Sequence, residues 1–228
     1  MIPLHDDNPT ELAPLLTVGL IITCVLVFLW QNSLGEEAGV QAIYSFGFIP
    51  AVLFDHVALP EALAKVPTTA TLFTSMFMHG GWMHLGGNLL YLWIFGNNIE
   101  DRLGHGRFML FYLLCGLAAA LAQALPDTTS QIPMVGASGA ISGILGAYLL
   151  LYPKARVLVL IPLGIIFYTL RLPALAVLGF WFVLQLISSL AAEPGQGGVA
   201  FGAHIGGFVA GMALLPLFLL TTRRGLRR

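Results

Sequence analysis

Charged residues are scarce in this chain of 228 residues: Asp, Glu, Lys and Arg make up 9% of it, against about 25% in an ordinary soluble domain. Hydrophobic residues make up 57%. A water-soluble fold of this size could not bury so much apolar surface, so we expect lipid to be its solvent. The ten basic and eleven acidic residues almost cancel, which argues against a nucleic-acid partner.

Cysteine and N-terminal basic residues are also scarce. Cys24 and Cys115 both lie within apolar runs, where we expect packing rather than a disulfide. The first twelve residues contain three acids and no Lys or Arg, so we do not expect a cleaved secretory signal. We predict one membrane domain at 13–222, between a short cytoplasmic segment at 1–12 and a basic cytoplasmic tail at 223–228.

Six apolar stretches approach the roughly 20 residues that a helix needs to cross a bilayer. They lie at about 13–31, 83–99, 107–125, 138–152, 172–191 and 199–221. The sequence therefore predicts an all-α membrane protein, a bundle of six transmembrane helices. Proline and glycine interrupt a further apolar stretch at 157–170, which we interpret as interfacial or strand-like. The long connection at 32–82 contains another interrupted apolar stretch, at 44–54, which suggests a segment in the membrane interface.

The basic residues favour six spans with both termini in the cytoplasm. Nine of the ten then face the cytoplasm, in agreement with the positive-inside rule, and Lys65 does not. The nine are Arg102, Arg107, Lys154, Arg156, Arg171, Arg223, Arg224, Arg227 and Arg228. A seventh span at 157–170 would divide them between the two sides of the membrane.

Ser138 begins the fourth expected span, in Gly136-Ala137-Ser138-Gly139. A helix from Ser138 to Pro153 would be about 22 Å long in a hydrocarbon core of about 30 Å, so Ser138 is expected below the surface in a wet recess. Unpaired N–H groups at a helix N-terminus favour developing negative charge, as a nucleophile requires. The alternative is a small-residue packing face. For Ser142, packing or a bond to a carbonyl is the preferred interpretation.

His204 lies in the sixth expected span, where an ionisable residue is costly and usually functional. Glycines at i+3 and i+7 share its face, and the fourth span carries matching glycines, so the two helices can pack closely and bring His204 to Ser138. His204 would then act as a general base; the alternative is a histidine bonded to a neighbouring carbonyl. No Asp or Glu lies in a span, so we expect a dyad, with Asp127 or Glu193 as less favoured third members.

His84 and Asn88 share a face of the second expected span, at i and i+4. Both can donate hydrogen bonds to an oxyanion, together with the backbone N–H of Ser138. His79 precedes them in the loop that shapes the mouth of the site. The competing interpretation is a metal site of His79, His84 and His204, but no carboxylate ligand or HExxH pattern accompanies these histidines. We therefore expect no metal and no organic cofactor.

Taken in order, these motifs resemble those of the rhomboid intramembrane serine proteases over about residues 10–220. His84-Leu85-Gly86-Gly87-Asn88 is similar to the HxxxN of the family's second span, Gly136-Ala137-Ser138-Gly139 to its GxSG, and Ala203-His204 to the motif of its sixth span. The resemblance implies Ser138 as nucleophile and His204 as base. It implies an oxyanion site of His84, Asn88 and the Ser138 amide, and we expect His79, Gly136, Gly139 and Ser142 to support it.

The resemblance also assigns parts outside the reacting groups. The connection at 32–82 resembles a partly embedded first loop, and Glu100 with Arg102 a structural charged pair. Trp181 and Phe182 in the fifth span would form a lateral gate, and the segment 193–198 a cap over the site. One departure is that some members carry an aromatic residue where this chain has Ser142, so His204 needs other support, from Ser142 itself or from elsewhere.

The function that the resemblance implies is hydrolysis of peptide bonds in or near transmembrane segments of membrane proteins, in a bacterial cytoplasmic membrane. Its partners would be transmembrane substrates and the lipid bilayer, and we expect a monomer. Substrates would have small residues at the cut and Gly or Pro nearby. Two alternatives stay open: a catalytically inactive relative that binds membrane proteins, and a small transporter or channel, for which we would expect charged residues or inverted repeats within spans.

Overall fold

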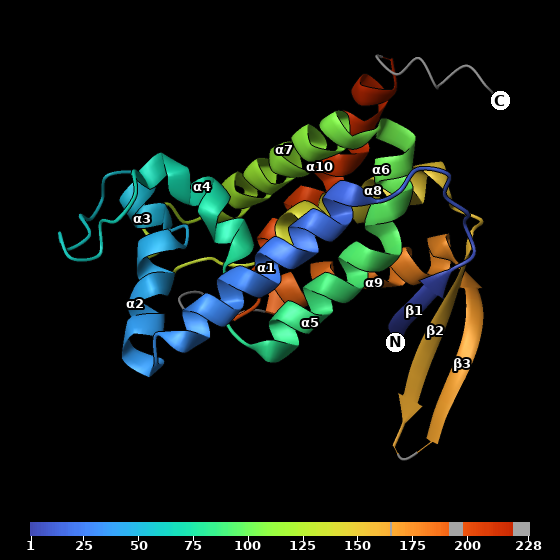
Figure 1. Ribbon diagram of the computed structural model, residues 1–228, viewed down its shortest axis with the longest axis horizontal. Coiled ribbons are helices and arrows are strands. Elements are labelled where there is room, and N and C mark those ends of the chain that lie inside the picture. Colours follow the sequence, from blue (N-terminus) through green and yellow to red (C-terminus); the bar gives the residue numbers. More distant parts are fainter. Residues whose placement is uncertain (165, 192–197, 221–228) are drawn as a thin grey trace.

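The computed structural model of the protein describes residues 1–164, 166–191 and 198–220, and within them the chain is mostly helical (Figure 1). Four helices are long and apolar enough to cross a membrane. They are α1 (Leu15–Ser33), α7 (His105–Ala124), α9 (Ala174–Ala191) and α10 (Phe201–Leu220). Their bounds fall within about two residues of the corresponding predicted spans.

The other two predicted spans are helical but less regular. α8 (Ser138–Leu151) is apolar but has 14 residues. The second span corresponds to α5 (Trp82–Tyr91), a wider π-type stretch at Leu92–Gly96 and α6 (Asn97–Leu103) in succession. The count of six spans therefore stays a prediction, whereas helices with the composition of membrane spans are present.

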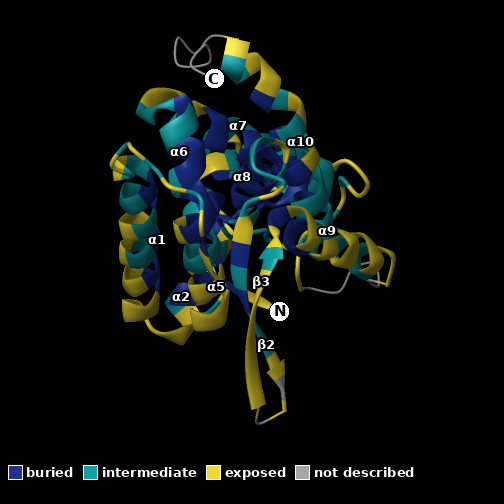
Figure 2. Cartoon of the chain, turned by 90° about the vertical axis from the view of Figure 1, so that its right-hand side faces the viewer, coloured by how far each residue is buried: buried dark blue, intermediate teal, exposed yellow. Residues whose placement is uncertain are grey.

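α8 is the most enclosed helix of the bundle and lies at its centre (Figure 2). It packs against α7 and α10. A Cβ on Gly207 would lie 2.1 Å from the carbonyl oxygen of Gly139, and one on Gly211 would lie 2.0 Å from that of Gly143. Any side chain there would collide with backbone, so α8 and α10 contact each other through glycine. The close packing that the glycine spacing predicts is confirmed.

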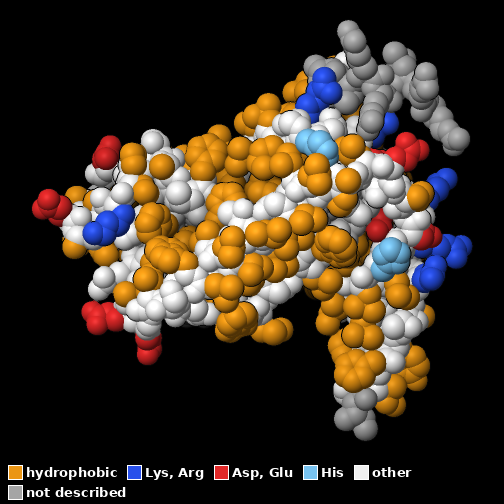
Figure 3. Space-filling model, in the orientation of Figure 1, with side chains coloured by type: hydrophobic (Ala, Val, Ile, Leu, Met, Phe, Trp, Pro, Cys, Tyr) orange, Lys and Arg blue, Asp and Glu red, His pale blue; other side chains and the backbone are white. Residues whose placement is uncertain are grey.

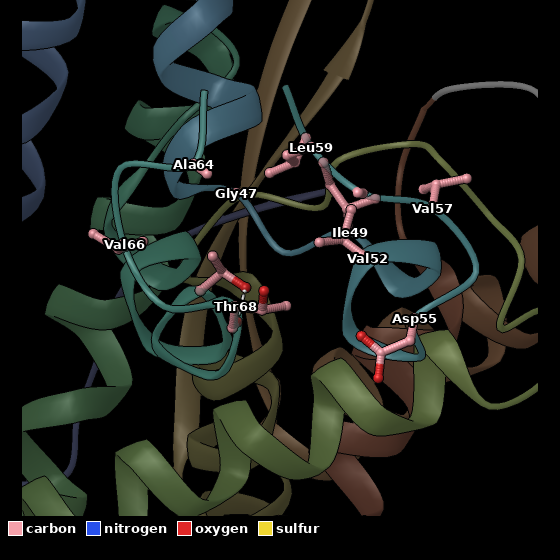
Figure 4. A pocket seen from close by; sticks show the side chains of 11 residues that line it. Gly47, Ile49, Val52, Asp55, Val57, Leu59, Ala64, Val66 and Thr68 are labelled. Carbon is pink, nitrogen blue, oxygen red and sulfur yellow. Dashed lines mark hydrogen bonds between the residues drawn. The ribbon is translucent and has the colours of Figure 1, made fainter. Parts of the chain in front are cut away.

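The connection between α1 and α5 contains three short helices, α2 (Glu36–Phe46), α3 (Pro50–Leu53) and α4 (Thr71–Thr74). Phe48, between α2 and α3, exchanges two backbone hydrogen bonds with Met134, of 3.0 and 2.7 Å. This bridge fixes the connection to the segment that leads into α8. A cavity of about 270 Å³ lies within the connection (Figure 4); its mostly apolar lining includes none of the residues around Ser138.

A small sheet corrects the all-α expectation. β1 (Ile2–Asp6), β2 (Arg156–Leu163) and β3 (Ile166–Pro173) form an antiparallel sheet in that order. The strand-like interpretation of 157–170 is confirmed. A two-stranded hairpin alone is marginally stable in water, and β1 from the N-terminal segment supplies the third strand. No strand was expected there, because its partner is about 150 positions away in the sequence.

Hydrogen bonds attach the N-terminal segment to the helices. The Asp6 carboxylate accepts from the Tyr148 hydroxyl at 2.6 Å and from the Asn98 side-chain amide at 3.0 Å. The Asp101 carboxylate accepts from the backbone N–H of Leu12 at 2.6 Å. The start of the chain is therefore bound to α6 and α8 as well as to β2.

Glu100 is fully buried and caps the first turn of α1, which corrects the expected pair of Glu100 with Arg102. Its carboxylate accepts from the backbone N–H groups of Leu16 and Thr17, both at 2.8 Å. The Thr17 hydroxyl and a ring nitrogen of His105 also contact it. Among the described residues, the basic side chain in contact with Glu100 is that of His105 rather than Arg102. A carboxylate that accepts helix N-terminal N–H groups stabilises the helix without a cationic partner.

Candidate active site

Ser138 and His204 lie in contact, supplied by two different helix N-termini. Nε2 of His204 is 2.8 Å from Oγ of Ser138, which is hydrogen-bond distance. Ser138 is the first residue of α8, and His204 lies in the first turn of α10. Both side chains are half-buried. Because glycine packing sets the separation of α8 and α10, it also sets the position of the imidazole relative to the hydroxyl.

The second ring nitrogen of His204 contacts Gln185 of α9, a residue that sequence reasoning missed. Nδ1 of His204 is 2.8 Å from Oε1 of Gln185, and the amide nitrogen of Gln185 donates to the Trp181 carbonyl at 3.4 Å. A carbonyl oxygen can only accept, so Nδ1 carries the ring proton and Nε2 is free to accept from Ser138. The sequence feature that could have indicated this role is that Gln185 is the one amide side chain in the apolar stretch 172–191, where polar side chains are costly.

Other proposed supports of His204 do not contact it. The Asp127 carboxylate accepts from the backbone N–H and hydroxyl of Thr129, at 3.1 and 2.7 Å. Glu193 lies outside the described residues. The Ser142 hydroxyl donates to the carbonyl oxygen of Ser138 at 2.6 Å, so support of His204 by Ser142 is wrong. This bond runs within α8 and leaves the Ser138 hydroxyl available to His204.

Trp181 and Phe182, the expected gate residues, pack against α10. The ring centroids of Trp181 and His204 are 5.8 Å apart with an angle of 36° between the planes. Phe182 stacks on Phe208 with centroids 4.5 Å apart. An aromatic ring therefore lies beside His204, and α9 supplies it rather than the helix that carries Ser138. Displacement of α9 would remove both Trp181 and Gln185 from the histidine.

His84 and Asn88 line the same cavity as Ser138. The backbone N–H of Gly80 donates to Nδ1 of His84 at 3.3 Å, so the proton of the neutral ring lies on Nε2. Nδ2 of Asn88 is buried and has no hydrogen-bond partner in the described part of the chain. A buried donor without an acceptor costs free energy. The two side chains therefore leave N–H donors free for an oxygen atom that enters the cavity.

Gly136 and Gly139 make room for neighbouring side chains. Gly136 has φ +120°, and a Cβ there would lie 2.6 Å from Nε2 of His84. A Cβ on Gly139 would lie 2.6 Å from the Cβ of Ala119 in α7. The Gly136 N–H donates to the Ser75 carbonyl at 2.8 Å, which fixes the approach of the chain to α8.

His79 lies fully buried behind His84, before α5 begins, and does not line the cavity. The ring centroids of the two histidines are 5.2 Å apart. Burial, with a smaller contribution from His84, lowers the pKa of His79 to about 4, so its ring is neutral at pH 7. A neutral ring in this position supports His84 by packing and adds no charge to the site.

The cavity around Ser138 measures about 1210 Å³. Its lining includes Ser138, His204, His84 and Asn88, together with Trp181, Gln123 and the segment 132–136. A space of this volume can hold several residues of an extended peptide.

In the described part of the chain, no three His, Cys, Asp or Glu residues lie close enough to share a metal ion, so His79, His84 and His204 do not form the alternative metal site. The expected basic tail and most of the expected cap at 193–198 lie outside the described residues.

Comparison with known proteins gives one consistent family. The family model described as the rhomboid domain matches residues 67–221. The Rhomboid protease GluP of Bacillus subtilis is 30% identical over 216 residues, which is 92% of this chain and 38% of that protein. RHOMBOID-like protein 5 of Arabidopsis thaliana is 32% identical over 168 residues, which is 74% of this chain and 50% of that protein.

A similarity also extends to the Rhomboid protease GlpG of Salmonella choleraesuis. It is 26% identical over 209 residues, which is 90% of this chain and 63% of that protein. The chain therefore spans less than two thirds of the length of each of these three relatives.

Proposed function

Since the chain belongs to the rhomboid family of membrane proteins, we propose that it is an intramembrane serine endopeptidase with Ser138 as nucleophile and His204 as general base. The observation that carries this proposal is the 2.8 Å contact between Nε2 of His204 and Oγ of Ser138. Gln185 completes the arrangement, because it holds the proton on Nδ1 and turns the basic nitrogen toward the hydroxyl.

The geometry supports acyl transfer in two stages. His204 Nε2 takes the hydroxyl proton while Oγ of Ser138 bonds to the carbonyl carbon of the scissile peptide. The resulting oxyanion accepts hydrogen bonds from His84, Asn88 and the Ser138 amide. The C–N bond then breaks, and the protonated His204 gives its proton to the leaving amine. Water, deprotonated by the same imidazole, then adds to the acyl carbon, the bond from that carbon to Oγ breaks, and the imidazolium returns its proton to Oγ of Ser138.

The substrate that fits this site is a membrane-spanning segment that unwinds locally before cleavage. In an intact helix each carbonyl is hydrogen-bonded within the helix, so it is shielded from Ser138 and from the oxyanion donors. Small residues at the cut, with Gly or Pro nearby, lower the cost of unwinding. We propose that such segments enter from the lipid beside α9, whose Trp181 and Phe182 act as the gate.

We further propose six spans, with both chain ends in the cytoplasm of a bacterial cell. Lys154, Arg156 and Arg171 then lie at the cytoplasmic end of the bundle and Lys65 at the outer end, consistent with the positive-inside rule. Figure 3 shows Lys and Arg side chains concentrated at the end of the molecule that carries α6 and the sheet. Ser138, at the opposite end of the short α8, would cut substrates near the outer face of the membrane.

The test is cleavage of a fluorescent transmembrane substrate by purified full-length protein in vesicles. We expect Ser138→Ala and His204→Ala each to abolish product. Ser142→Ala removes a hydroxyl one turn along the same helix and serves as the matched control, with activity within a few-fold of the native protein. A mechanism-based serine inhibitor should label Ser138, as mapped by mass spectrometry. Equal product from all four proteins would reject the protease and leave the inactive, membrane-protein-binding relative as the function.

A further inference from the structure

The β2–β3 hairpin extends beyond the helices, and its outer half is apolar on both faces. The hairpin projects between α5 and α9 (Figure 2), with β1 in contact with α5 and both hairpin strands in contact with α9. Near the bundle, Val157 and Val159 are fully buried against the helices. Further out on the same face lies Tyr168, 53% exposed, and on the opposite face lies Phe167, 64% exposed.

Basic residues lie where the hairpin joins the bundle. Lys154, Arg156 and Arg171 are exposed, and none forms an ion pair with another described residue. The sequence contains no Asp or Glu between Asp127 and Glu193. The acid nearest to these cations is Asp7 of the N-terminal segment, whose carboxylate accepts from the backbone N–H of Arg156 at 2.7 Å. The hairpin therefore combines an uncharged apolar tip with a base at which three cations outnumber the one adjacent carboxylate, that of Asp7.

We propose that this hairpin is a lipid-binding element: its tip enters the bilayer interface, and its base binds anionic lipid headgroups. An apolar tip exposed on both faces fits lipid, which surrounds an inserted element, better than a protein partner, which would cover one face. Figure 3 shows hydrophobic side chains over the visible face of the sheet down toward its tip. Tyr side chains favour the interface and Arg side chains extend toward headgroups.

The backbone of β3 limits how deep the element lies. β3 is an edge strand, with one neighbour in the sheet, so one row of its N–H and C=O groups has no strand partner. Such groups are not tolerated in the hydrocarbon core but find water and headgroups at its boundary. Since α9 begins directly after β3 and carries Gln185, the lipid contact is adjacent to the element that orients His204.

The test uses an environment-sensitive nitrobenzoxadiazole label on single added cysteines in the full chain, reconstituted in vesicles. Native Cys24 and Cys115 are buried, so the label goes to the added site. Phe167→Cys and Tyr168→Cys report the two faces of the tip, and Glu11→Cys, exposed on the N-terminal segment, is the matched control. We expect blue-shifted emission at both tip positions, with at least twofold stronger quenching by brominated acyl chains than at position 11.

Headgroup binding is tested in the same preparation by comparing phosphatidylcholine vesicles with vesicles that contain phosphatidylglycerol. We expect phosphatidylglycerol to increase quenching at position 167, and the double variant Arg156→Gln/Arg171→Gln to lose the increase. Quenching at one tip position without the other, or at neither, would overturn insertion of the tip. Shielding that rises with the protein-to-lipid ratio would assign the surface to a second copy of the chain. Both readouts are independent of proteolysis.

Discussion

Replacing Gln185 by leucine tests whether α9 orients His204, the proposed general base. The substitution keeps the approximate size of the side chain and removes the oxygen that lies 2.8 Å from Nδ1 of His204. The Nδ1–H group would then lack its acceptor in a half-buried site, and the ring could place its proton on Nε2 instead, where it blocks proton transfer from Ser138. The change acts on the histidine without removing either reacting group.

The hydrogen bond that Gln185→Leu removes determines how far kcat should fall. A buried donor left without its partner costs about 1–3 kcal/mol, and about 1.4 kcal/mol corresponds to a tenfold change in rate. We therefore expect kcat to fall by about 5- to 150-fold for Gln185→Leu. KM should change little, because Gln185 does not line the substrate cavity. Steady-state cleavage of a transmembrane substrate in vesicles measures both constants.

Two further variants separate positioning from general damage to α9. Gln185→Glu keeps an oxygen acceptor at the same reach and should retain clearly more activity than Gln185→Leu. Val183→Ala, on the exposed side of the same helix, should leave kcat within about twofold, as surface substitutions usually have small effects. If Gln185→Leu retains full kcat with an unchanged melting temperature, the orienting role is refuted. Equal losses in all three variants would point to disruption of α9 instead.

Three other predictions follow from single contacts. Asn88→Ala removes a proposed oxyanion donor and should lower kcat about 100- to 1000-fold with Tm unchanged; a loss below threefold would contradict that role. Gly207→Ala places a methyl group 2.1 Å from the Gly139 carbonyl oxygen and should lower the free energy of unfolding by about 1–3 kcal/mol, as measured by thermal unfolding. Gly179→Ala, with open space around it, should leave the free energy of unfolding unchanged. Burial raises the pKa of Asp6 despite the hydrogen bond from Tyr148, so the folded state binds the proton more tightly than the unfolded state does. The free energy of unfolding should therefore increase as pH falls from 7 toward 4. Thermal unfolding of Asp6→Asn should not show this increase.

The pairing of Ser138 with His204 could be predicted because it depends on local regularities. Helical periodicity puts His204, Gly207 and Gly211 on one face, and glycine on the facing helix allows backbone contact. The packing of the two helices then brings the side chains of Ser138 and His204 together, since both lie near a helix N-terminus. The same reasoning placed His84 and Asn88 together, because four residues separate them on one helix.

What sequence reasoning missed depends on contacts between distant segments. β1 joins β2 across about 150 positions, and the alternation of apolar residues in Ile2–Asp6 is too short to identify a strand. Gln185 was missed for a different reason. Its position in α9 was correctly predicted to be helical, but whether its side chain faces His204 depends on how α9 packs against α10, which the sequence of α9 alone does not determine.

A neutral amide suits this position better than a carboxylate would. Desolvating an ionised carboxylate within a membrane domain costs several kcal/mol unless it is fully paired, and before reaction the imidazole is neutral and cannot compensate for that cost. Gln185 fixes the tautomer of His204 through one hydrogen bond and adds no charge to be desolvated. The consequence is kinetic: an amide stabilises the imidazolium formed during attack less than an anion does, because charge-assisted hydrogen bonds are about twice as strong. The site therefore favours stability in the bilayer over rate, and turnover should be slower than that of soluble proteases with a Ser-His-Asp triad.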